Sequence, residues 1–120
     1  MVIEIPGLET DKGLDFSDGD VSTYLRFLRL FVTNIPESLG KMRNVSQETL
    51  MEYAATVHSV KSNCEIIGAE EARVVAKQLE AMAKGGDLSG VLVQNKAFIE
   101  YVEKLLESIR DWLKKTGAGS

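Results

Sequence analysis

Apolar residues recur at steps of three and four over most of this 120-residue chain, and few residues interrupt the repeat. Such a repeat places apolar side chains along one side of an α-helix. Only two prolines occur, and no segment of strand length alternates apolar with polar residues. The pattern therefore predicts an all-α chain, and its length fits one domain.

Four long helices are predicted from this repeat. The first should begin near Asp20, with Asp18, Asp20 or Ser22 as its side-chain cap. It should kink at Pro36, which lacks a backbone N–H. The others are expected over residues 46–67, 69–84 and 92–115, with Ser46 capping the second and Gly68 ending it. The predicted core positions are Leu25, Leu28, Phe31 or Val32, Ile35, Leu39 and Met42; Leu50, Tyr53, Val57, Val60, Cys64 and Ile67; Ala72, Ala76, Leu79 and Ala83; and Phe98, Val102, Leu105, Ile109 and Trp112 or Leu113.

The connections between these helices are short, which favours antiparallel neighbours. We therefore expect an antiparallel up-down four-helix bundle over residues 20–115. Residues 1–19 are expected to form an N-terminal segment with one short helical turn, anchored over the end of the domain by Leu8 and Leu14. Residues 116–120 are expected to be a flexible tail.

Composition restricts the class of function. The net charge is −4, which argues against nucleic acid as a partner, and no apolar run approaches the roughly 20 residues of a membrane span. The single cysteine, Cys64, fits a reducing cytoplasm and is expected to be a small buried residue. One histidine without a Glu-x-x-His run predicts no metal site, and no cofactor motif is present.

His58, the only histidine, falls inside the second predicted helix but directly after the stripe residue Val57, about 100° from the apolar side. A neutral imidazole is a good nucleophile near pH 7, and Lys61, one turn further on, could stabilise the charge of a phosphoryl group. An ordinary surface histidine beside a solvated lysine is the alternative at this point. The outward face carries Met51, Ala55, His58, Ser62 and Glu65, and the small Ala55 and Ser62 leave the imidazole accessible.

The order His58-x-x-Lys61-Ser62, followed by Gly68-Ala69, resembles the histidine-containing phosphotransfer (HPt) domain of two-component phosphorelays. The N-terminal Ile5-Pro6-Gly7-Leu8, the segment from Asp20 to Phe31, and Leu79-Glu80 with Gly86-Asp87-Leu88 extend the resemblance over nearly the whole chain. Two positions depart from the common pattern. Ser62 replaces the usual glycine, and Asn63 replaces a residue that is more often small and apolar.

The resemblance implies a phosphoryl carrier, not an enzyme, with His58 as phosphoacceptor and Lys61 as the charge-stabilising neighbour. Glu80 aligns with a position where some members place a polar residue that orients the imidazole; a solvated surface glutamate is the other interpretation. The implied partners are response-regulator receiver domains, with contacts at Met51, Ala55, Ser62 and Glu65, and an upstream hybrid histidine kinase from which the domain could have been excised.

We further expect a cytoplasmic monomer without membrane insertion. The competing hypothesis from another class is a non-catalytic helical adaptor that binds a signalling partner through an apolar face and tolerates the loss of His58. A dedicated hydrolase or kinase is disfavoured because the sequence offers no nucleotide site or acid–base pair.

Overall fold

The computed structural model describes residues 2–118, in which all regular structure is helical. A short helix precedes four long ones, and no strand occurs in this range. The helices are α1 (Thr10–Phe16), α2 (Val21–Met42), α3 (Leu50–Ile67), α4 (Glu70–Lys84) and α5 (Leu88–Thr116). The prediction of an all-α chain is confirmed. None of the helices in the described range has the length and apolar character needed to cross a membrane.

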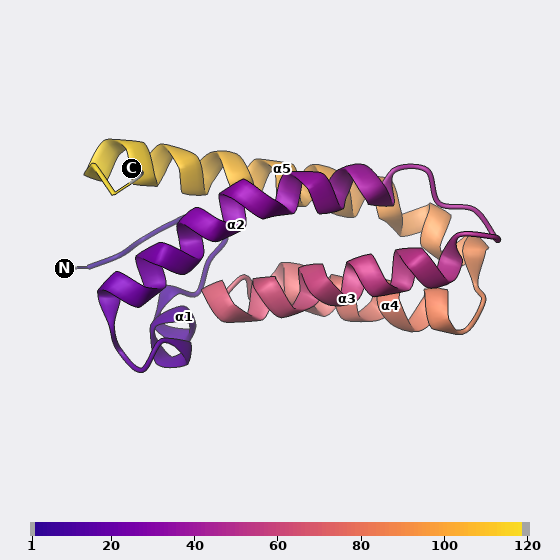
Figure 1. Cartoon of the computed structure of the whole chain (residues 1–120), viewed down its shortest axis with the longest axis horizontal. Coiled ribbons are helices and arrows are strands. Elements are labelled where there is room, and N and C mark those ends of the chain that lie inside the picture. The colour runs from indigo at the N-terminus through magenta and orange to yellow at the C-terminus, as the bar shows by residue number, and fades with distance from the viewer. Residues whose placement is uncertain (1, 119–120) are drawn as a thin grey trace.

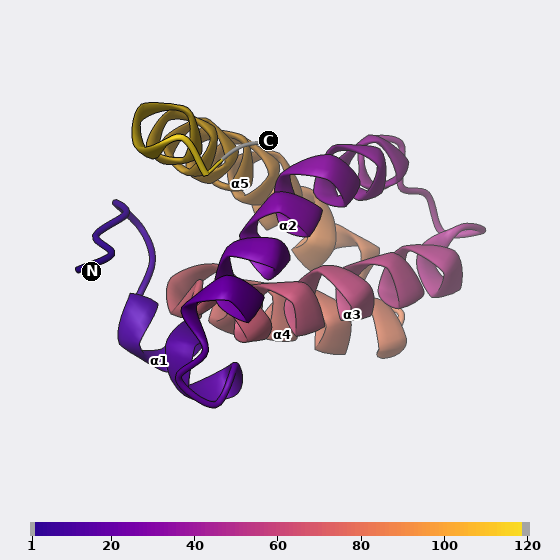
Figure 2. The same ribbon diagram turned by 60° about the vertical axis from the view of Figure 1, so that its left-hand side comes forward.

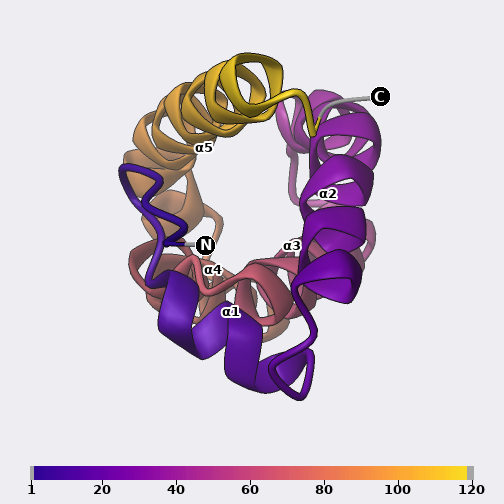
Figure 3. The ribbon, with the colours of Figure 1, turned by 90° about the vertical axis from the view of Figure 1, so that its left-hand side faces the viewer.

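The four long helices surround one apolar core. Helix α3 packs against α2 and α4, and α5 packs against α4 and α2, so the helices form a ring in the end-on view of Figure 3. Helix α1 lies at the end of the molecule where α2 begins, in contact with α3 and α2 (Figures 1 and 2). Both described ends of the chain lie toward that same end.

The predicted apolar stripes form the core, with one correction. Tyr24 is fully buried in place of the expected Leu25, because its hydroxyl donates to the backbone oxygen of Ile67 across 2.8 Å. Phe31 and Leu113 are the buried members of the two pairs that the sequence left open. The stripes of α3 and α4 are buried as predicted.

Two helix starts were predicted wrongly, each by four residues. Helix α3 begins at Leu50 because the side chains and backbones of Ser46 and Thr49 bond to each other in a preceding turn. Helix α5 begins at Leu88, where the Asp87 carboxylate accepts from the Gly90 N–H. Of the three candidate caps of α2, the structure uses Asp20, whose carboxylate accepts from the Ser22 and Thr23 N–H groups.

Helix α2 continues through Pro36 without a break, and the kink expected there stays a prediction.

The N-terminal segment is fastened to the end of α3. Gly68 ends that helix in the left-handed conformation, with φ of 81°, and its carbonyl accepts from the Glu9 N–H across 2.8 Å. A Cβ at Gly68 would overlap the Glu9 carbonyl oxygen, so both backbone conformation and close approach require glycine. Ile3 and Ile5 are buried in the common core. The segment thereby fixes the C-terminal end of α3.

The expected tail is partly outside the described residues. Gly117 ends α5, and the Ala118 carbonyl accepts from the Arg29 guanidinium across 3.1 Å. Residues 119 and 120 of the predicted flexible tail, like Met1 of the predicted N-terminal segment, lie outside the described range.

Candidate functional site

His58 lies near the middle of α3 and faces away from the core. The buried Val57 and Val60 fix the rotation of the helix, and the His58 side chain is 58% exposed. The sequence predicted this outward position from the phase of the stripe. A rigid helix therefore presents the imidazole on an open surface rather than inside a cleft.

Glu80 projects from α4 toward His58, with its Oε2 atom 2.8 Å from His58 Nδ1. Although charged, Glu80 is only 4% exposed, so the interpretation as a solvated surface glutamate is wrong. The small core residues Ala76 and Ala83 lie one turn on either side of it and permit a close approach of α4 to α3. This approach brings the Glu80 carboxylate under the imidazole.

Two lysines share the same carboxylate. Lys61 Nζ lies 2.6 Å from Glu80 Oε1, and Lys84 Nζ lies 2.9 Å from Oε2. Lys61 was expected beside His58, but Lys84 was missed by the sequence reasoning. Its spacing of four residues from Glu80 on one helix is the signal that could have found it. The cluster is therefore built from two residues on α3 and two on α4.

The bonds to this carboxylate keep it ionised. Burial raises the pKa of Glu80, but the hydrogen bonds from Lys61, Lys84 and His58 outweigh burial and lower the pKa to about 2. An ionised carboxylate accepts hydrogen bonds and cannot donate them, so the ring nitrogen facing it must carry its proton. A neutral His58 in this arrangement has a protonated Nδ1 and an unprotonated Nε2.

The predicted partner-binding residues all lie on α3. Met51, Ala55 and Glu65 are exposed, and Ser62 is half-buried. Met51, with 66% of its surface exposed, is the large apolar side chain among them. These side chains surround His58 along the helix but take no part in the hydrogen bonds of the Glu80 cluster.

Cys64 is separate from this cluster. It is fully buried, as predicted, and burial raises the pKa of its thiol to about 12, so it remains protonated at neutral pH. Within residues 2–118, no three His, Cys, Asp or Glu side chains are grouped as ligands of a metal ion.

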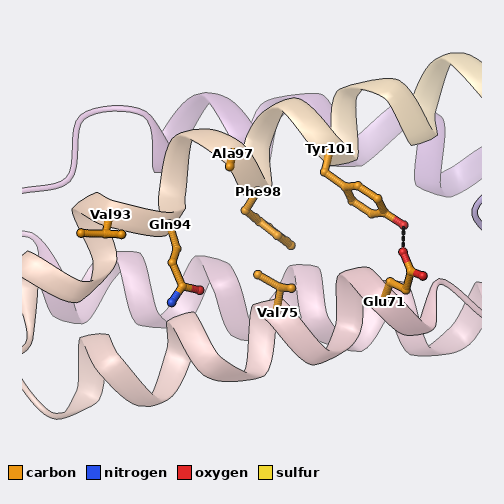
Figure 4. A pocket seen from close by; sticks show the side chains of 7 residues that line it. All are labelled: Glu71, Val75, Val93, Gln94, Ala97, Phe98 and Tyr101. Atoms are coloured by element: carbon orange, nitrogen blue, oxygen red, sulfur yellow. Dashed lines mark hydrogen bonds between the residues drawn. The ribbon is translucent and has the colours of Figure 1, made fainter.

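An apolar groove of about 350 Å³ lies elsewhere, between α4 and α5 (Figure 4). Val75 and Phe98 face each other across it, and the Tyr101 hydroxyl donates to Glu71 across 3.0 Å at one end. None of the side chains of the His58 cluster lines it; the lining residues are Glu71, Val75, Val93, Gln94, Ala97, Phe98 and Tyr101. The groove and the His58 cluster are therefore separate features.

Comparison with known proteins supports the resemblance found in the motifs. The model of the Hpt domain family matches residues 26–112, which include every member of the His58 cluster. Searches of curated proteins and of solved structures found no match. Since the family match spans well over half of the 120 residues, the chain belongs to the Hpt domain family, whose members are phosphocarrier modules of two-component phosphorelay signalling.

Proposed function

We propose that His58 receives a phosphoryl group from the phosphorylated aspartate of one receiver domain and passes it to the aspartate of another. The observation that carries this proposal is the pairing of an exposed imidazole with a buried, ionised carboxylate. His58 Nδ1 bonds to Glu80 across 2.8 Å, so its Nε2 is the nitrogen with a free electron pair. His58 is also the only histidine in the sequence.

The transfer follows from this arrangement. The Nε2 electron pair forms a bond to phosphorus, while the bond between phosphorus and the aspartyl oxygen breaks and leaves an aspartate carboxylate. The Nδ1 proton stays on the ring, which becomes positively charged. The Glu80 carboxylate, already in place, stabilises that charge without reorganising. The same steps in reverse deliver the phosphoryl group to a second receiver.

Lys61 is proposed to stabilise the phosphoryl oxygens. Its ammonium group has three N–H donors, of which one is used in the 2.6 Å bond to Glu80. The others remain for an anionic group on His58, one helical turn away. In this proposal Lys61 donates to the Glu80 carboxylate and to the phosphoryl oxygens at the same time.

A receiver domain is proposed to dock on the exposed side of α3. Met51 supplies an apolar contact, and Ala55 and Ser62 are small enough for the receiver to approach His58, with Glu65 at the edge. The acidic pocket of a receiver would be attracted by Lys61 and by the other bases nearby, Arg73 and Lys77.

The topology of the bundle, the limits of its segments and its cellular setting are part of the same proposal. We take the four long helices as an antiparallel up-down bundle over residues 20–115, with residues 1–19 as an N-terminal cap and 116–120 as the tail. The domain would act as a cytoplasmic monomer without catalytic activity of its own, and an upstream hybrid histidine kinase would supply the phosphoryl groups. The two-residue link between α3 and α4 supports antiparallel packing of that pair.

The test uses the His58→Gln variant and receiver domains charged with acetyl phosphate. We expect wild-type protein to acquire a phosphate that is labile in acid and stable in base, and the variant to acquire none. Circular dichroism should show unchanged helicity, because the replaced side chain is exposed on the surface of α3. Undiminished labelling of a folded His58→Gln protein would refute the proposal.

The adaptor hypothesis has one observation in its favour, which is the apolar groove between α4 and α5 (Figure 4). An adaptor that uses this groove would signal equally well without His58. Signalling in cells that carry His58→Gln in place of the wild type separates the two: phosphotransfer predicts its loss, and an adaptor predicts that it persists.

A further inference from the structure

We propose that Lys84 is a positioning residue which, by sharing one oxygen of Glu80 with His58, keeps the imidazole neutral and its Nε2 ready to accept a phosphoryl group. This inference rests on the proposed function of His58. It concerns a residue that does not touch the phosphoryl group and whose ion-pair partner is Glu80.

The two oxygens of Glu80 have different partners. Oε1 accepts from Lys61, whereas Oε2 accepts from both His58 Nδ1, at 2.8 Å, and Lys84 Nζ, at 2.9 Å. Each cation on a carboxylate oxygen reduces the negative charge that the oxygen offers to its other partners. Lys84 therefore acts on the same atom that His58 contacts, and Lys61 acts on the other atom.

A buried carboxylate beside a histidine favours the doubly protonated imidazolium, in which both ring nitrogens carry protons. An imidazolium has no free electron pair and cannot accept a phosphoryl group. The positive charge of Lys84 opposes this second protonation, while the bond to Glu80 still holds the proton on Nδ1. The result is a ring that is oriented by a carboxylate and yet remains neutral.

The charged side chains near His58 belong to two helices, α3 and α4. Lys61 is on its own helix, and Glu80 and Lys84 are on α4; within residues 2–118, no ion pair joins His58 to α1 or α2. Glu80, with its pKa lowered to about 2, stays ionised throughout the neutral range. Titration of Glu80 therefore does not contribute to a change in uptake between pH 6.5 and 8.5.

The experiment measures phosphorylation of the full chain by phosphoramidate, a small donor that needs no docking surface. The Nε2 electron pair bonds to phosphorus, the P–N bond of the donor breaks, and ammonia leaves with its electrons. Rates are compared as ratios to wild type at each pH, which cancels the pH dependence of the reagent. The variants are Lys84→Gln, Lys84→Arg and Lys41→Gln. Lys41 is a matched control, because it is an exposed lysine four residues after its glutamate, Glu37.

We expect Lys84→Gln to react about threefold to fivefold more slowly than wild type at pH 6.5, the size of effect that a half-exposed ion pair can produce. The deficit should vanish at pH 8.5, and ¹⁵N spectra at pH 6.5 should show more imidazolium. Lys84→Arg and Lys41→Gln should match wild type. Equal rates for Lys84→Gln at both pH values, or an equal loss at both, would overturn the inference. Labelling of His58→Gln would instead refute the proposed function, which keeps the two failures distinguishable.

Discussion

Glu80 and Asn95 are buried to nearly the same extent, with 4% and 5% of their surfaces exposed, but their hydrogen bonds have different roles. Asn95, on α5, accepts from the Tyr53 hydroxyl across 2.7 Å and donates to the Met42 carbonyl across 2.8 Å. These partners are themselves buried and neutral, and they tie α5 to α3 and α2. The partners of Glu80 are charged or titratable, and each of them extends toward solvent.

The difference teaches how one small bundle uses buried polar groups in two ways. A neutral network closed on itself holds three helices in one arrangement and leaves nothing reactive. Burying a carboxylate costs free energy, and it is tolerated here because cations bond to both of its oxygens. In return, under the proposed function, the carboxylate holds the proton on His58 Nδ1 and leaves Nε2 to accept a phosphoryl group. We expect Asn95 to matter for stability and Glu80 for pH dependence and chemistry.

The largest effect on stability is expected from Asn95→Leu, which leaves the Tyr53 hydroxyl and the Met42 carbonyl without partners in the core. Each unsatisfied buried group costs roughly 1–3 kcal/mol, so the free energy of unfolding should fall by about 4 kcal/mol in urea titrations. Phosphoramidate labelling of the folded variant should equal wild type. A loss below about 1 kcal/mol would mean that the network is not a structural tie.

The fold could be predicted from sequence further than the site could. Stripes of Leu, Val and Ala predicted the buried faces of α3 and α4, because helical geometry alone connects spacing with burial. The same rule places Glu80 beside the buried Leu79 but does not tell whether its carboxylate reaches water or another helix. That depends on how closely α3 and α4 approach, which is a tertiary property.

The positions of the helix ends were also only partly predictable from the sequence. Asp87 is a recognisable cap, so the start of α5 at Leu88 could have been predicted from local chemistry, although the apolar repeat placed it at residue 92. Ser46 looked like an equally good cap, but it bonds with Thr49 in a turn instead. Short polar side chains can cap a helix or bond within a turn, and the sequence alone did not show which of the two Ser46 does.

The next largest effect is expected for Glu80→Gln, whose free energy of unfolding is compared with that of wild type as a function of pH. The folded-state pKa, about 2, lies below the ordinary glutamate value of 4.5, so ionised Glu80 stabilises the fold above the unfolded-state pKa. That contribution is lost as the pH falls from about 4.5 to 2, and it corresponds to about 3 kcal/mol. Unfolding free energies of both proteins from pH 7 to pH 2 provide the measurement.

Glutamine is the appropriate replacement because it keeps the size and one acceptor oxygen but cannot titrate in this range. All other carboxylates are common to the two proteins, so their titration cancels in the difference. The stability of wild type relative to Glu80→Gln should therefore decrease only below about pH 4.5. A difference that stays constant down to pH 2 would show that the carboxylate is not held by its three partners.

The smallest effect is expected from Tyr53→Phe, which removes a single hydroxyl from the Asn95 network. Asn95 keeps its bond to the Met42 carbonyl, and only its Oδ1 loses a partner, so the unfolding free energy should fall by about 1 kcal/mol. Tyr53 lies on α3, five residues before His58, which makes the variant a sharp test of how separate the two networks are. If they are independent, the pH profile of phosphoramidate labelling will match wild type, and the stability losses of Tyr53→Phe and Glu80→Gln will add in the double variant. If the loss in the double variant differs from the sum of the single losses by more than about 0.5 kcal/mol, α3 couples the Asn95 network to the Glu80 cluster. The separation of a structural role for Asn95 from a chemical role for Glu80 would then not hold.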